Sequence, residues 1–371
     1  MKKIVVILLS LFLITGCGSK KESNIIKDFK SDLNKIDSYI IKGEMVISSN
    51  EDKFTYDVVA SNKENTFYKV NLVNKTNNHE QVILKNKEAV YVVTPSLNKS
   101  FKFQSEWPNN GSQVYLLDGL LRDLDNDSSL TLKKVNNGYV ITSKVNYPNN
   151  SNLVTEDIYI DKKMKLKSVE VKDSDGNVKI KFTVKNIDYN PSFNKEYFDL
   201  DLLIDNCCDD NGSKNTTTTT TTKPSTETTT KPNGGQETTQ PNQNTSENDT
   251  TTSNIMDDII YPLYIPSDTY LSTKDTVNTS EGNRVILTFA GEKPFMLVEE
   301  MSVRNNDFEI IPVYGDPLMM ADNIGALSAN SLYWTSNNID YYITSDSLNG
   351  EELLTIAESL GNSSLIVNGE K

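Results

Sequence analysis

The residues best suited to chemistry in this chain of 371 residues are three cysteines and a single histidine. The first cysteine, Cys17, follows a short N-terminal segment in which Lys2 and Lys3 precede an apolar run over residues 4–14. A run of that length is too short to span a bilayer permanently, which takes about 20 residues, so residues 1–16 are predicted to be an export signal. The ending Ile-Thr-Gly-Cys has the pattern of a lipobox, which predicts a diacylglycerol on the Cys17 sulfur. An ordinary signal with a cysteine here by chance is the alternative.

The two remaining cysteines and the histidine give weaker signals. Cys207 and Cys208 are adjacent, and neighbouring cysteines can bridge each other only through a strained ring. They could bind a soft metal, accept an acyl group or link to another chain, but residues without a special role at a domain end are the favoured interpretation. His79 lies in the polar loop Asn-Asn-His-Glu and is predicted to be a solvated surface side chain.

No motif predicts an enzyme. The sequence contains no Gly-x-Ser-x-Gly elbow, no His-Glu-x-x-His pair, no P-loop and no dinucleotide fingerprint. Acidic pairs at residues 257–258, 299–300 and 351–352 lack the spacing of a calcium-binding loop. We therefore expect no catalytic residue, no bound metal and no cofactor.

The charge of the chain is concentrated in its last third. The whole sequence has 37 Lys+Arg against 51 Asp+Glu, and residues 255–371 alone have 5 against 18. This balance argues against a nucleic-acid partner, which requires a basic surface. A difference this sharp predicts separate modules: a neutral domain over residues 25–205 and an acidic α+β domain over residues 255–371.

The segment between the two modules is rich in Thr, Asn and Pro. Residues 206–254 contain almost no large apolar side chain and are predicted to form a disordered linker, solvated or carrying O-glycans. We expect the two domains to be independent. We also expect the acidic domain to stay away from the anionic membrane and to recruit a basic partner, unless its charge serves only solubility.

The N-terminal domain is predicted to be mainly β with helices. Apolar residues recur at helical spacing over residues 25–36, and the period then changes to two in a series of short strands up to residue 184. A helix interrupts the strands at residues 112–124. It is either a cap on the core or a movable lid over a groove.

The order of these elements resembles the lipoprotein-carrier LolA family and its relatives, which include the sigma-E pathway sensor RseB and germination lipoproteins. The resemblance covers roughly residues 25–202 and rests on short matches at residues 43–47, 81–84, 89–95, 157–161 and 193–200. It implies an incomplete β-barrel wrapped around helices, with a hydrophobic cavity for acyl chains. Carriers of this family are soluble shuttles, whereas Cys17 would tether this chain.

The acidic domain is predicted to contain strands at residues 284–290, 295–299, 308–314, 331–335 and 339–344. A helix follows, with Asn349 as its candidate cap and Gly361 as its stop. This domain resembles a small uncharacterised extracytoplasmic domain of Gram-positive lipoproteins.

These features together predict a non-catalytic lipoprotein that is anchored through Cys17 to the outer face of the cell membrane. Residues 17–24 are predicted to be the lipidated cysteine and a short tether to the N-terminal domain. A hydrophobic ligand (a lipid, an acyl chain or a lipidated protein) is expected in a groove of the N-terminal domain. Alternation and the inserted helix give the candidate lining: Phe54, Tyr56, Tyr91, Val93, Phe103, Trp107, Leu117 and Leu121. The alternative is a regulatory or scaffold lipoprotein, RseB-like or acting in sporulation or germination, that contacts an anti-sigma factor or another envelope protein.

The substitution Cys17→Ala tests the anchor. The variant is expected to move from the membrane fraction to the medium, because no later segment is long and apolar enough to span a bilayer. Fractionation followed by immunoblotting measures this. Retention of the variant in the membrane fraction would contradict the predicted lipobox or show that a protein partner suffices.

Overall fold

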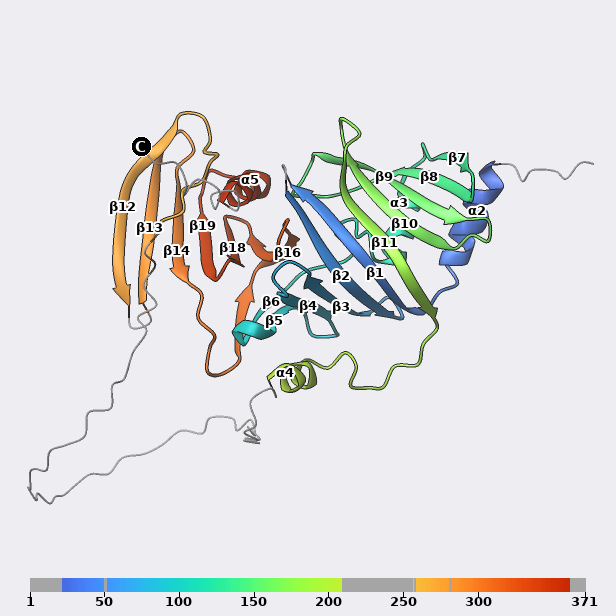
Figure 1. Ribbon diagram of the computed structural model, residues 1–371, viewed down its shortest axis with the longest axis horizontal. Helices are drawn as coiled ribbons and strands as arrows, with labels where there is room; N and C mark the ends of the chain where they lie inside the picture. Colours follow the sequence, from blue (N-terminus) through green and yellow to red (C-terminus); the bar gives the residue numbers. More distant parts are fainter. Residues whose placement is uncertain (1–21, 50–51, 209–255, 257, 280–281, 361–371) are drawn as a thin grey trace, which may run out of the picture.

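The computed structural model describes residues 22–49, 52–208, 256, 258–279 and 282–360 and arranges them in two β-sheets (Figure 1). One sheet has twelve strands and the other has seven, and both are open rather than closed into a barrel. The predicted class, mainly β with few helices, is confirmed. The predicted signal peptide, the lipidated Cys17 and the linker beyond residue 208 lie outside the described residues.

The twelve strands of the first sheet are β1 (Ser38–Ser49), β2 (Asp52–Lys63), β3 (Phe67–Asn74), β4 (Glu80–Lys85), β5 (Val90–Thr94), β6 (Lys99–Phe103), β7 (Thr131–Val135), β8 (Gly138–Lys144), β9 (Leu153–Asp161), β10 (Leu166–Asp173), β11 (Val178–Tyr189) and β15 (Glu309–Val313). The seven strands of the second are β12 (Thr269–Thr279), β13 (Gly282–Gly291), β14 (Phe295–Met301), β16 (Gly315–Met319), β17 (Ile324–Ser328), β18 (Ser331–Ser336) and β19 (Ile339–Thr344). The helices are α2 (Glu22–Leu33), the 3₁₀ turn η2 (Pro95–Leu97), α3 (Leu117–Asn126), α4 (Leu200–Cys208) and α5 (Gly350–Leu360).

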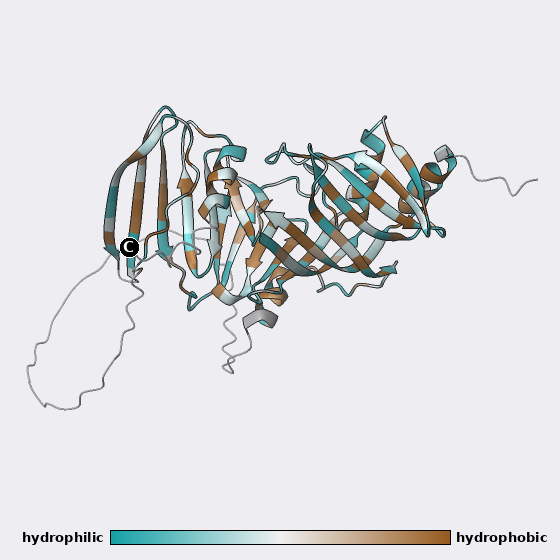
Figure 2. Ribbon diagram, turned by 45° about the horizontal axis from the view of Figure 1, so that its top comes forward, coloured by the Kyte–Doolittle hydropathy of each residue, from teal (hydrophilic) through white to brown (hydrophobic). Residues whose placement is uncertain are grey.

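Alternating side chains decide which face of the first sheet is covered by helices. In β3, every second residue is buried, including Tyr68, Val70 and Leu72. Figure 2 shows hydrophobic and hydrophilic residues alternating along neighbouring strands of this sheet. These residues share one core with Phe29 of α2 and Leu120 of α3. The chain's own helices therefore fill the space along this face of the sheet.

Helix α3 begins five residues later than predicted, at Leu117 rather than at Ser112. Ser112 is held in a loop by two hydrogen bonds with the backbone of Asn146. The helix start is fixed by Tyr39, whose hydroxyl accepts from the Leu117 N–H at 3.0 Å and donates to Asp118 at 2.7 Å. A helix tied to buried residues in this way is a cap on the core rather than a lid.

The short strand β15 joins the C-terminal part of the chain to the N-terminal sheet. It runs parallel to β6, with Glu309 opposite Lys99 and Val313 opposite Phe103. The sequence pattern predicted this strand within the acidic domain, and periodicity alone cannot show which sheet a strand joins. The expectation that the two domains are independent is wrong, because they share a sheet.

A buried ion pair lies where the two parts meet. The Lys99 ammonium is 3.0 Å from Asp340, and each side chain is only 9% exposed. Lys99 also donates to the Tyr333 hydroxyl at 2.7 Å. A charge removed from water to this degree is tolerated only when it is paired and hydrogen-bonded.

Further polar contacts extend this junction. The Gln81 side chain accepts from the Ile324 N–H at 2.7 Å and donates to the Ile324 carbonyl at 3.2 Å. The Tyr56 hydroxyl donates to the Ala321 carbonyl at 2.9 Å. These bonds satisfy backbone groups of the C-terminal part that docking buries.

Helix α5 covers one face of the second sheet, and Asn349 caps it as predicted. The Asn349 side chain accepts from the Glu352 N–H, and the Glu352 carboxylate accepts from the Asn349 N–H, both at 3.0 Å. This reciprocal pair satisfies two N–H groups at the start of the helix. None of the helices in the described ranges is long and apolar enough to cross a membrane.

The ion pair at the junction gives a stability prediction. Asp340→Asn leaves the Lys99 ammonium buried without a counter-charge, so we expect the free energy of unfolding to fall by about 3–5 kcal/mol. Urea denaturation measures this. As a control, Asp32→Asn removes an exposed pair with Lys35 and should cost under about 1 kcal/mol. Equal effects from the two substitutions would contradict the structural role of the buried pair.

Candidate functional site

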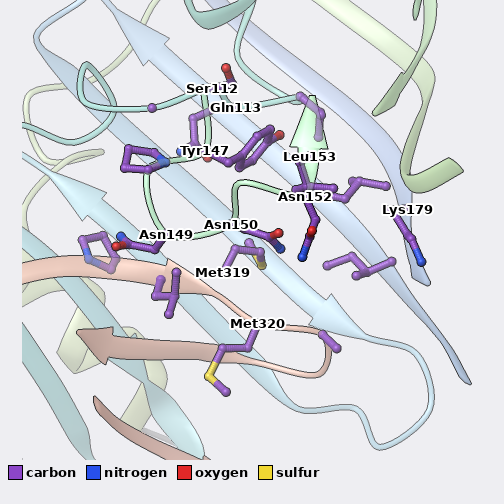
Figure 3. Close-up of a pocket in the computed structure, with 18 of the residues that line it drawn as sticks. Ser112, Gln113, Tyr147, Asn149, Asn150, Asn152, Leu153, Lys179, Met319 and Met320 are labelled. Carbon is purple, nitrogen blue, oxygen red and sulfur yellow. The ribbon is translucent and has the colours of Figure 1, made fainter. Parts of the chain in front are cut away.

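A cavity of about 310 Å³ lies between the two sheets (Figure 3). Its wall from the N-terminal part is made by strands β1, β9 and β11 and by the loops over residues 107–115 and 147–152. Its wall from the C-terminal part is made by residues 316–321 and by Glu358 of α5. This volume is at the lower end of the range for small-molecule sites.

The inner part of the cavity is apolar. Met45 and Ile47 of β1 point to the helix-covered face, and Ile47 lies opposite Ile180 of β11. Met319 and Met320 at the end of β16 complete this surface from the C-terminal side. Methionine side chains are flexible and polarisable, so they adapt to apolar ligands of different shape.

The outer part is a rim of side-chain amides. Asn149, Asn150 and Asn152 all lie on the loop between β8 and β9 (Figure 3). That loop is attached to α5 by a hydrogen bond from Ser151 to Glu351 at 2.6 Å. Within the described residues, the amides of Asn150 and Asn152 form no hydrogen bond with another protein group.

Two groups of opposite charge also line the cavity. Lys179 comes from β11 and Glu358 from α5, and Lys179 also lies 3.5 Å from Asp173. Burial raises the pKa of Glu358, the charge of Asp322 raises it further, and Lys179 acts in the opposite direction. The third charged residue, Asp316, accepts hydrogen bonds from Ser105 and Asn110.

A pair of buried carboxyl groups lies behind this wall. Asp123 of α3 is 6% exposed and Glu156 of β9 is 1% exposed, and each has one oxygen without a hydrogen-bond partner. Ser143 faces Glu156 across the β8–β9 pairing and bonds to the Asp123 carbonyl. Burial raises the pKa of Asp123 to about 6. It also raises the pKa of Glu156 well above its usual value, and Asp123 adds to that shift.

Of the eight residues predicted to line a groove, Trp107 lies on this cavity. Tyr56, Phe103 and Leu117 are buried in the core beneath the helices, and Phe54 and Leu121 pack against that core. Tyr91 and Val93 belong to a separate cluster on the opposite face of the sheet, against Phe198 and Leu203. The β5–β6 register explains this, because Tyr91 lies opposite Lys102 rather than Phe103.

The loop amides and the methionines were not predicted as site residues. The run Pro-Asn-Asn-Ser-Asn at residues 148–152 is an ordinary loop composition. The consecutive apolar residues Leu318, Met319 and Met320 in an acidic domain were the available signal. The loop at residues 148–152 and the segment at residues 318–320 line one cavity only when the two parts of the chain are docked.

His79 is half-buried rather than solvated, which corrects the prediction from its loop. Its Nε2 atom is shielded and has no hydrogen-bond partner. Burial lowers the pKa of His79, and the nearby charge of Asp322 acts against that shift. In the parts of the chain that the structure describes, no three His, Cys, Asp or Glu side chains are grouped so that they could hold a metal ion.

Two docked sheets with a partly apolar, partly amide-lined cavity define a β-rich protein with room for a small ligand. The chain belongs to the family of YdcC-like sporulation proteins, whose family model matches residues 1–198. Sporulation protein YdcC of Bacillus subtilis strain 168 is 33% identical to it over 356 residues, which cover 95% of this chain and 94% of that protein.

Two solved structures are similar to this chain at low TM-scores. The MucA/MucB complex of Pseudomonas aeruginosa matches with a TM-score of 0.29 and 9% identity, over 91% of this chain and 96% of that one. The LolA superfamily protein NE2245 of Nitrosomonas europaea matches with a TM-score of 0.29 and 9% identity, over 50% of this chain and 100% of that one.

The buried carboxyl pair predicts a pH dependence of stability. Because the pKa of Asp123 in the folded protein, about 6, exceeds that of an unfolded aspartate, protonation stabilises the fold at low pH, and this stabilisation is lost as the pH rises through 6. Asp123→Asn should therefore raise the melting temperature at pH 7.5 by roughly 2–6 °C. It should have little effect at pH 4.5. A variant destabilised equally at both values would contradict this assignment.

Proposed function

We propose that this protein is a non-catalytic binding lipoprotein on the extracytoplasmic face of the cell membrane. Its anchor is the diacylglycerol on Cys17, and its ligand is a hydrophobic chain that belongs to a lipid or to a lipidated protein. The lipobox pattern supports the anchor. The name of its relative in Bacillus subtilis supports a role in spore formation.

The observation that carries the binding function is the cavity between the sheets. It combines an apolar inner wall, formed by Met45, Ile47, Ile180 and Met319, with a polar mouth. This arrangement suits an amphiphile, whose chain replaces water against the apolar wall and whose polar end stays at the mouth. At about 310 Å³ the cavity has room for one end of a lipid rather than for a whole two-chain lipid.

A second candidate function is a scaffold that acts through protein contacts. The observation that favours it is a set of exposed apolar side chains near the start of β12, in which Leu263 is 57% exposed and Tyr270 is 61% exposed. Large exposed apolar side chains that are close together are typical of interaction surfaces. The acidic charge of residues 255–371 favours a basic partner for such a surface.

Mass spectrometry of lipid extracts tests the binding function on the full mature chain carrying Cys17→Ala, which is purified without its own anchor. We expect a lipid or an acyl chain to be recovered with this protein. Met319→Lys places a charge against the apolar wall and should lower the recovered amount by about tenfold or more, because an ammonium is costly to bury without a partner.

The matched control is Val178→Lys, at an exposed position outside the cavity, which should leave the recovered amount unchanged. Emission from Trp107, which lines the cavity, gives a second readout when 1-decanol is added. A chain that carries no lipid and shows no response of Trp107 to 1-decanol would contradict the binding function and leave the scaffold function in its place.

A further inference from the structure

We infer that the ligand of this cavity has an uncharged head group rich in hydroxyl groups, as a sugar-headed lipid has, rather than a phosphate. The inference rests on the proposed function, because it concerns the polar end of the same ligand. The observation behind it is that the amides of the half-buried Asn150 and the exposed Asn152 line the cavity and bond to no other group of the described residues (Figure 3).

The hydrogen-bonding capacity of these amides matches a sugar. Each asparagine side chain offers two N–H donors and one carbonyl acceptor. A sugar hydroxyl donates and accepts at once, so neighbouring hydroxyls can use both kinds of group. A phosphate monoanion or dianion offers mainly acceptors, so it can use the N–H donors of these amides but few of their carbonyl acceptors.

The charges around the cavity disfavour an anion. Glu358 and Asp316 line it, whereas Lys179 is the one cation among its described lining residues and already lies 3.5 Å from Asp173. An incoming phosphate would meet more negative than positive charge, whereas a neutral head group meets no such repulsion.

Aromatic rings complete the match. Trp107, Tyr115 and Tyr147 also line the cavity. The C–H faces of a sugar ring are apolar, and aromatic side chains provide flat surfaces on which such faces can be buried. The lining therefore combines amide, aromatic and aliphatic side chains, which correspond to the hydroxyls, the ring and the chain of an alkyl glycoside.

Three probes with the same eight-carbon chain test this inference by titration calorimetry on the full mature chain carrying Cys17→Ala. They are octyl β-glucoside, octyl phosphate and 1-octanol, each used below the concentration at which it forms micelles or separates. We expect the glucoside to bind about tenfold or more tightly than the phosphate. The double substitution Asn150→Ala with Asn152→Ala should weaken glucoside binding about tenfold and leave the affinity for 1-octanol unchanged.

The matched control is Asn136→Ala, in the exposed turn between β7 and β8 and away from the cavity, which should not change any of the three affinities. Melting temperatures establish that the variants are folded. Phosphate binding as tight as glucoside binding, or an unchanged glucoside affinity in the double variant, would overturn the inference while 1-octanol binding upholds the proposed function. If none of the three probes binds, the proposed function fails and the inference fails with it.

Discussion

The structure depends on the pairing of β15 with β6, through which the acidic part of the chain completes the edge of the neutral sheet. An unpaired edge presents a row of free N–H and C=O groups, which β15 satisfies over residues 309–313. The same contact buries the ammonium of Lys99, so that Asp340 and Tyr333 must lie beside it. The pairing of β15 with β6 and the ion pair of Lys99 therefore depend on one another. Once β15 is in place, the buried Lys99 ammonium requires a counter-charge, and Asp340 of the second sheet supplies it.

This constraint also creates the cavity. Strand β16 follows β15 after a single residue, so the register of β15 fixes where Met319 and Met320 lie. They complete the apolar wall begun by Ile47 and Ile180. The face of the first sheet that bears the helices is filled by residues such as Phe29 and Leu120. Space for a ligand is therefore found at the junction of the two sheets rather than inside one of them, and it exists only in the docked arrangement.

The sequence of the C-terminal part has a large excess of acidic residues, but this excess does not describe the charges at the junction. Two of its carboxylates at the junction have specific partners. Asp340 pairs with Lys99, and Asp316 accepts from Ser105 and Asn110. By contrast, Asp123 and Glu156 in the N-terminal part keep unpartnered oxygens next to the cavity wall. Buried carboxyls of this kind reduce stability near neutral pH.

The sequence by itself determined many of the elements and several local details: most period-two strands, the cap at Asn349, and the presence of a helix before residue 126, but not β12, β16, β17 or α4. These follow from interactions between residues close in the chain, for which periodicity and capping rules suffice. It could not determine that Tyr91 and Phe103 lie on opposite faces of the sheet. Both faces of β5 are buried, so its apolar and polar residues do not alternate and the sequence does not show which face each side chain is on. Nor could it determine the sheet that residues 309–313 join, or that the loop at 148–152 meets Met319. Only the tertiary structure decided these, because each depends on packing between segments far apart in the chain, such as Tyr91 against Phe198 or residues 309–313 against residues 99–103, and no local pattern encodes such a contact.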